Sequence, residues 1–318
     1  MLGAAAAGFL LQACNGTKAP VFVSPDGSVM VGINGPDVDE RLAEEAWQKR
    51  LIFHVGPIDL PAGTAAEEME DAPLIMRFNT GEDLWVTAFE PRVVSASGAG
   101  LPGELLSRAM LINLHEENEL CGQSGSGNAA FVATSMLTDV ELPQGYGYPV
   151  LATDPLEARA VLMNRTGQGH SGVYFEITLK ARPMNEFANL KDVKPMLVEF
   201  DPCGHAAVDI EPGAFSERSA SYRLSKGSRV IMVNGAMGDR GASMELVAGS
   251  EIAPFWRSEA TLDEGQGLVA LSDNPFVDMR TTLAEGDEIK FSAAFDNSSG
   301  GWLRGATAAA MMYVNPAE

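Results

Sequence analysis

Histidine is the side chain most often used for metal binding and proton transfer. This chain has four histidines, His54, His115, His170 and His205. No two of them are separated by the one to three residues typical of paired metal ligands. Phosphate loops, zinc-protease motifs, EF-hand loops and the hydrolase nucleophile elbow are also missing from the sequence. Each histidine is therefore expected to be an ordinary strand or loop residue.

The three cysteines offer a second kind of chemistry. Cys14 follows an apolar, uncharged run at residues 4–13, and the segment 11–14 (LQAC) resembles the lipobox of bacterial lipoproteins, in which the cysteine is lipidated. At about 1.5 Å per residue the run is too short for a hydrocarbon core of about 30 Å, and its length is typical of an export signal. An uncleaved helix packed on the protein or on a partner is the alternative.

Two cysteines, Cys121 and Cys203, remain once Cys14 is assigned to lipid. An even pair in an exported chain is available for one disulfide, because the compartment is oxidising. Two buried free thiols are the alternative.

Carboxylates form the third reactive group. Glu116, Glu117 and Glu119 follow His115 in one short run, and Asp239 lies in the second half of the chain. Two carboxylates about 5–9 Å apart can catalyse glycoside hydrolysis, so a glycan-processing site between two domains is one hypothesis. A solvated loop is the alternative for the run 115–119.

The composition limits the partners that these groups can have. The chain has 318 residues, 46% of them hydrophobic, and a net charge of −21. This is a folded composition, and at this length two domains are expected rather than one. A strongly acidic surface does not bind the phosphate backbone, so nucleic acid is excluded as a partner.

Short alternating segments predict an all-β protein. In residues 172–180, Val173, Phe175, Ile177 and Leu179 share one face of a strand, and similar runs recur between turn residues from 51 to 314. The 15 methionines mostly lie inside such apolar runs and are expected to fill the core. Helical spacing is clear only at 38–50, and residues 182–194 form the best candidate linker between two halves.

Several segments, in this order, resemble the copper type II, ascorbate-dependent monooxygenases, the group of peptidylglycine alpha-hydroxylating monooxygenase. The segments that carry this resemblance are residues 51–63, 107–112, 142–149, 160–164, 236–241, 283–289 and 309–313. The resemblance implies two tandem jelly-roll β-sandwiches. The chain then divides into a lipoprotein-type signal and anchor at 1–14, an N-terminal extension with a short helix at 15–50, a first jelly roll at 51–190 and a second at 191–318.

The resemblance also implies six copper-ligand positions, and this chain has lost the donors at nearly all of them. Alanine and glycine offer no donor atom, arginine carries a permanent positive charge, and a lone thioether binds copper weakly. No catalytic residue, metal or cofactor is therefore expected. The six positions hold Arg108, Ala109, Met163, Ala236, Gly238 and Ala306.

These features together predict a non-catalytic, exported, lipid-anchored binding or structural subunit at the periplasmic face of a bacterial membrane. Its expected partners are proteins at that surface, for example an electron-transfer or photosynthetic complex, and the membrane itself through Cys14. The alternative is an enzyme with a relocated site. That enzyme is either a diverged copper-dependent monooxygenase that uses His115, His170, His205 and methionines, or a glycan-processing enzyme.

Overall fold

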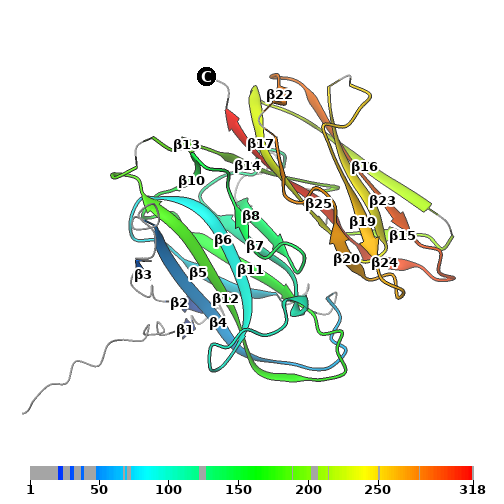
Figure 1. Ribbon diagram of the computed structural model, residues 1–318, viewed down its shortest axis with the longest axis horizontal. Coiled ribbons are helices and arrows are strands. Elements are labelled where there is room, and N and C mark those ends of the chain that lie inside the picture. Colours follow the sequence, from blue (N-terminus) through cyan, green and yellow to red (C-terminus); the bar gives the residue numbers. More distant parts are fainter. Residues whose placement is uncertain are drawn as a thin grey trace, which may run out of the picture.

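The computed structural model describes residues 21–23, 29–31, 37–38, 48–66, 69, 73–121, 127–187, 189–201, 207–213, 215–249, 251–278 and 280–316. Within these residues the chain is an all-β protein, as the alternating pattern predicts, and it has two β-sandwiches in tandem (Figure 1). No helix in this described part is long and apolar enough to cross a membrane.

The first sandwich is a jelly roll with four main strands in each of its two layers. One layer has the order β5-β11-β7-β8 and the other β4-β12-β6-β10, the arrangement that two Greek keys produce. The bounds are β4 Lys49–Leu60, β5 Leu74–Phe78, β6 Leu84–Ser95, β7 Leu106–Asn113, β8 Asn128–Thr134, β10 Tyr146–Val150, β11 Leu156–Leu162 and β12 His170–Pro183. Smaller elements are β1 Val21–Val23, β2 Val29–Val31, β3 Asp37–Val38, the 3-10 turn Gly103–Leu105, β9 Val140–Glu141 and β13 Lys191–Asp192.

The second sandwich repeats this strand order. Its layers are β16-β23-β18-β19-β20 and β14-β25-β17-β21, with β22 also paired to β17. The bounds are β14 Lys194–Glu199, β16 Phe215–Arg223, β17 Ser228–Met237, β18 Gly241–Ala248, β19 Trp256–Leu262, β20 Leu268–Leu271, β21 Phe276–Val277, β22 Thr282–Leu283, β23 Glu288–Asp296 and β25 Ala308–Pro316. A two-stranded sheet joins β15 Val208–Ile210 to β24 Leu303–Ala306.

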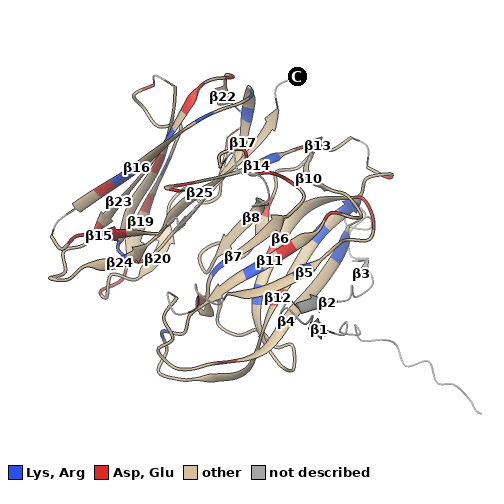
Figure 2. Cartoon of the chain, turned by 180° about the vertical axis from the view of Figure 1, so that it is seen from behind, with Lys and Arg blue, Asp and Glu red and all other residues tan. Residues whose placement is uncertain are grey.

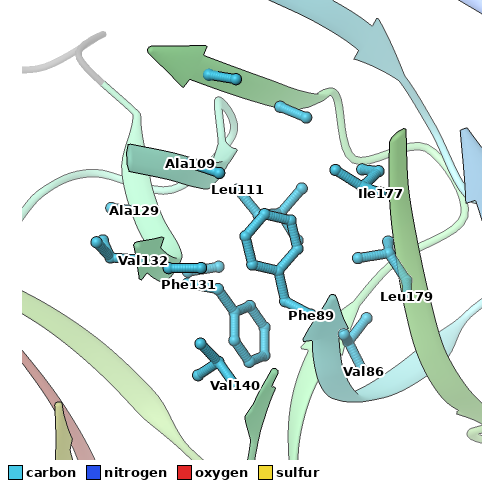
Figure 3. Packing of buried hydrophobic residues seen from close by; sticks show 14 of the residues in the cluster. Val86, Phe89, Ala109, Leu111, Ala129, Phe131, Val132, Val140, Ile177 and Leu179 are labelled. Carbon is cyan, nitrogen blue, oxygen red and sulfur yellow. The ribbon is translucent and has the colours of Figure 1, made fainter. Parts of the chain in front are cut away.

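The predicted alternation in β12 is confirmed. Val173, Phe175, Ile177 and Leu179 are all 0% exposed and belong to the core of the first jelly roll. Phe89 and Phe131 lie in the middle of this core, with ring centroids 6.0 Å apart (Figure 3). Because side chains alternate across a strand, the opposite face of β12 remains available for polar residues.

Three strands lack this alternation because they are buried on both sides. Every residue of β8 is buried, as are nearly all residues of β17 and β25. One side of the β17–β25 layer faces the second core through residues such as Met312, and the other side, including Tyr313, joins the core of the first jelly roll. The Phe131 and Tyr313 ring centroids are 5.7 Å apart, so an apolar junction unites the two sandwiches.

The N-terminal extension differs from its prediction where it can be followed. The helix expected at 38–50 is replaced at its ends by strands, since Asp37–Val38 form β3 and pair with Lys49 and Arg50 of β4. Residues 39–47, the apolar run 4–13 and Cys14 lie outside the described residues. The candidate linker begins within β12 and contains β13, which pairs with β10 through Tyr146 and Gly147.

Candidate functional site

The structure brings three of the six predicted ligand positions to one small pocket at the junction of the two jelly rolls. Arg108 comes from β7, Ala236 from β17, and Gly238 follows β17 directly. The pocket has a volume of about 40 Å³, which admits roughly three water molecules. We call it the junction pocket, and its lining residues are Ser107, Arg108, Thr134, Glu199, Ala236, Met237, Gly238, Thr307, Ala308 and Ala309.

The other three predicted positions do not line this pocket. Ala109 is 0% exposed in the core of the first jelly roll. Met163 is buried directly after β11, and its amide donates to Leu105 O at 2.9 Å. Ala306 is buried in β24 opposite Val208. The structure therefore does not assemble the six positions into one site or into two facing sites.

The pocket owes its shape to small residues where β17 ends and β25 begins. The amide of Gly238 donates to Thr307 O at 2.9 Å, which ties the two strand ends together. A Cβ atom at position 238 would lie only 3.2 Å from Thr307 Oγ1. The backbones therefore approach closely, and the space left is that of water molecules rather than of a substrate, since ligand pockets usually measure about 300–1,000 Å³.

Arg108 and Glu199 are the charged side chains of the pocket. Burial raises the pKa of the Glu199 carboxyl to about 7, although the positive charge of Arg108 opposes this shift and Asp201 adds to it. The phenol of Tyr222 donates to the backbone oxygen of Glu199 and fixes the end of β14. A carboxyl with a pKa near neutrality can take up or release a proton at physiological pH.

Sequence reasoning missed Glu199, Thr134 and Thr307. Glu199 ends the apolar strand β14, and nothing in its neighbourhood in the sequence distinguishes it from a solvated strand end. It becomes unusual only because the fold buries it in the junction pocket, beside Arg108 of β7. No local sequence signal reports such a meeting of distant strands.

The histidines do not provide a metal centre in the part of the chain that is described. His54 is buried in β4, where its ring meets the edge of Tyr174 at 5.9 Å. His115 follows β7, and its amide donates to Asn113 Oδ1 at 2.9 Å, while His170 begins β12 and pairs with Leu60. His205 lies outside the described residues. No group of three His, Cys, Asp or Glu side chains suited to a metal ion occurs among the residues described.

Three of the four carboxylates proposed for glycan chemistry have structural partners among the described residues. Glu119 forms an ion pair with Lys194 of β14 and accepts from Ser225 Oγ at 3.4 Å. Asp239 accepts from Arg165 at 2.5 Å. Each of these contacts joins the first jelly roll to the second. Glu116 accepts from Asn128 at 3.3 Å within the first jelly roll.

Cys121 is disulfide-bonded. Cys203 lies outside the described residues, so the pairing of these two cysteines stays a prediction. Lipidation of Cys14 stays a prediction for the same reason.

Two open grooves of about 540 and 760 Å³ both include Leu190 in their lining. The first includes Tyr146 and Arg182, and the guanidinium of Arg182 lies 5.1 Å from the centre of the Phe187 ring. The second includes Trp85 of the first jelly roll and Arg229 of the second. Neither groove contains a residue that the sequence singled out for chemistry.

Comparison with known proteins gives a fold-level likeness. No family model and no curated protein matches the sequence. Among solved structures, the major capsid protein P2 of bacteriophage PM2 is 10% identical and aligns over 85% of this chain and 98% of its own, with a TM-score of 0.33. The STIV major capsid protein is 10% identical over 83% and 96%, with a TM-score of 0.32. PNGF-II is 8% identical over 85% and 59%, with a TM-score of 0.38. We draw no functional conclusion from likenesses at this level.

The expected membership of the copper type II monooxygenase family is wrong. The structural similarity found is to double jelly-roll viral capsid proteins. The segments that suggested the family have roles general to jelly rolls: residues 142–149 form a turn and most of β10, and residues 283–289 run from the end of β22 through a turn into β23. Strand alternation with Gly, Pro and Asp turns therefore produced a resemblance of fold, and only three of the six ligand positions derived from it line one pocket.

Proposed function

We propose that this chain is a non-catalytic structural or binding subunit, exported to the periplasmic face of a bacterial membrane and held there by lipid on Cys14. The two jelly rolls act as one unit that presents its outer sheets and loops to protein partners of a membrane complex. A single acyl chain anchors only marginally, so a lipoprotein needs several chains or a protein partner for stable attachment.

The packed junction carries this proposal. In a two-domain enzyme a substrate commonly enters between the domains, whereas here Phe131, Ile231, Met311 and Tyr313 fill the corresponding space with buried apolar side chains. The amide of Asn234, also buried, donates to Val132 O across the junction at 3.0 Å. A filled junction supports a scaffold role, because apolar side chains occupy the space through which a substrate would otherwise enter.

The test of anchoring compares the full chain with Cys14→Ser in the host bacterium, because serine has no sulfur to acylate. We expect the full chain in the membrane fraction, resistant to a wash with about 1 M salt and released by detergent. Cys14→Ser should leave the membrane fraction, and Thr17→Ser, the matched control, should not. Equal retention of Cys14→Ser and the full chain would refute the anchor.

The test of the scaffold role uses Glu199→Gln, which removes the acidic side chain that lines the junction pocket. In a host that lacks the native copy, this variant should restore the same amount of cross-linked membrane complex as the full chain. A folded Glu199→Gln protein that fails to restore the complex, or a full chain recovered free of any membrane protein, would contradict the proposal.

A further inference from the structure

Strand β16 is a long, regular edge of the second jelly roll. It has nine residues and, among the described strands, a single neighbour, β23. The pairing runs from Phe215 opposite Asp296 to Arg223 opposite Glu288 without a bulge. β16 contains no proline or lysine, the residues that commonly protect an edge from pairing with another strand. Its outward backbone groups can therefore accept a further strand.

The first jelly roll shows what this place in the fold can hold. Strand β5 occupies the place of β16, next to β11 as β16 is next to β23. β5 is not an edge, because β2 pairs with it through Met76 and Arg77, and β1 pairs with β2. One copy of the jelly roll thus carries an added strand at this position, and the other does not within the described residues.

The sequence of β16 is complementary to itself in the antiparallel direction. When two copies pair with Ala220 opposite Ala220, Glu217 of each strand lies opposite Arg223 of the other. In the same register Arg218 lies opposite Tyr222, and Ser219 lies opposite Ser221. Directly opposed side chains in an antiparallel pair point to the same face and lie about 5 Å apart, close enough for ion pairs and cation–π contacts.

The outward side chains are available for this pairing. Glu217 and Arg223 are both exposed, and neither forms an ion pair with another described residue. Figure 2 shows acidic and basic positions along this outer strand. Small residues at 219–221 occupy the centre of the register and leave no bulk to separate two backbones.

We infer that β16 is a homotypic interface: two copies of this chain pair through antiparallel β16 strands about a two-fold axis at Ala220. The pairing continues the β16-β23-β18-β19-β20 sheet from one copy into the next. The interface is isologous, so each copy contributes the same surface and the assembly closes as a dimer. It does not depend on the proposed membrane anchor.

Charge reversal gives a direct test by sedimentation velocity of the full chain in detergent solution. The unmodified chain should form dimers whose fraction rises with concentration and falls with salt. Glu217→Arg places two Arg–Arg pairs in the interface, and Arg223→Glu places two Glu–Glu pairs. Each variant alone should weaken dimerisation roughly tenfold or more, because like charges directly opposite repel.

Mixing the two variants is the decisive step. In a mixed dimer, Arg at 217 of one copy faces Glu at 223 of the other, and the native Arg223 faces the native Glu217. The equimolar mixture should therefore dimerise about as well as the unmodified chain, and so should the double variant Glu217→Arg/Arg223→Glu.

The matched control is Glu264→Arg, which reverses an exposed charge in the turn between β19 and β20; it should dimerise like the unmodified chain. A full chain that stays monomeric at about 100 µM, far above the Kd of a specific dimer, would overturn the inference. So would single variants that dimerise normally, or a mixture that remains as weak as its components. Because rescue by mixing requires both proteins to be folded, misfolding cannot imitate the expected result.

Discussion

The two jelly rolls end strands β11 and β23 in turns built by equivalent asparagines. Asn164 donates from Nδ2 to Leu60 O, Pro61 O and Gln168 O at 3.2, 2.9 and 2.8 Å. Asn297 donates to Ile210 O, Glu211 O and Gly301 O at 3.1, 3.0 and 3.0 Å. Both asparagines are 0% exposed, so each amide satisfies backbone carbonyls that water does not reach.

The equivalence extends along the neighbouring chain. Thr166 and Ser299 each donate a hydroxyl to the asparagine two residues earlier, at 2.7 and 2.6 Å. Before the strands, Asp154 and Asp287 accept from the amide three residues earlier at 2.9 and 2.8 Å. Each aspartate precedes its asparagine at the same spacing. The two halves are thus structural repeats that keep their turn chemistry although their strand sequences differ.

The repeats differ in what their corresponding sheets face. In the first jelly roll, the outer side of β4, β6 and β12 carries Glu90 with Arg50, Arg92 and Lys180 around it, and Figure 2 shows these charges gathered on the strands. In the second, the outer side of β17 and β25 carries apolar residues such as Tyr313 and packs into the junction. Corresponding sheets of the two repeats therefore form a charged surface in one case and a buried domain junction in the other, and the side chains on the outer face determine the difference.

Phe131→Ala is expected to have the largest effect on stability and on the coupling between the two repeats. Phe131 is 0% exposed and touches Phe89, Tyr148 and Tyr313, so truncation should lower the free energy of unfolding by about 3–5 kcal/mol. Because Tyr313 belongs to the other repeat, denaturant unfolding should separate into two transitions. Phe53→Ala, equally buried but stacked on Phe78 within the first jelly roll, is the matched control and should destabilise that repeat alone. A single unshifted transition for Phe131→Ala would mean that the repeats stay coupled without the Phe131 ring.

Asn164→Ala and Asn297→Ala test whether the repeats are energetically equivalent. Each substitution leaves three backbone carbonyls without their hydrogen-bond donor. Each should therefore lower the free energy of unfolding by about 2–4 kcal/mol, measured by urea denaturation. Asn315→Ala, which removes one exposed hydrogen bond to Asp192 O, should cost about 1 kcal/mol or less. If one buried asparagine proved costly and the other nearly neutral, the turns would be similar in geometry only.

Glu199→Gln tests the charge at the junction. Burial raises the pKa of Glu199 to about 7 in the folded chain, above its unfolded value of about 4.5. Between these two values the folded state binds the extra proton, so stability should fall as pH rises through this window. The ionised group then costs about 2–3 kcal/mol above pH 7. Between pH 5 and pH 8 the unmodified chain should therefore lose about 2–3 kcal/mol more of its free energy of unfolding than Glu199→Gln does. Glu264→Gln should leave the difference unchanged, and a Glu199→Gln chain with an unaltered pH profile would contradict the assignment.

The sequence could predict the alternating strands, because half-buried strands such as β12 record their faces in a period of two. The two tandem jelly rolls were expected from the family resemblance. The sequence could not predict the junction. Strands β8, β17 and β25 are apolar on both sides and so carry no periodic signal that distinguishes a neighbouring domain from an ordinary core. The repeated Asn-x-Ser/Thr-Gly at Asn164 and Asn297 was the missed signal, since two copies of a turn motif at matching places indicate a repeated fold.

Arg165→Ala should have the smallest effect, because it removes an exposed ion pair that only the first repeat makes. Arg165 follows Asn164 and forms an ion pair with Asp239 of the other repeat. Ser298, at the same place after Asn297, bonds through its amide to Asp296 of its own repeat. The two side chains of the ion pair are 49% and 40% exposed, so water screens their attraction and the loss should be about 1 kcal/mol or less, shrinking further at about 1 M salt. Ser298→Ala is the matched control and should change stability by about 0.5 kcal/mol or less. A loss above about 2 kcal/mol for Arg165→Ala would show that the polar ties, rather than the apolar contact of Phe131 with Tyr313, hold the repeats together.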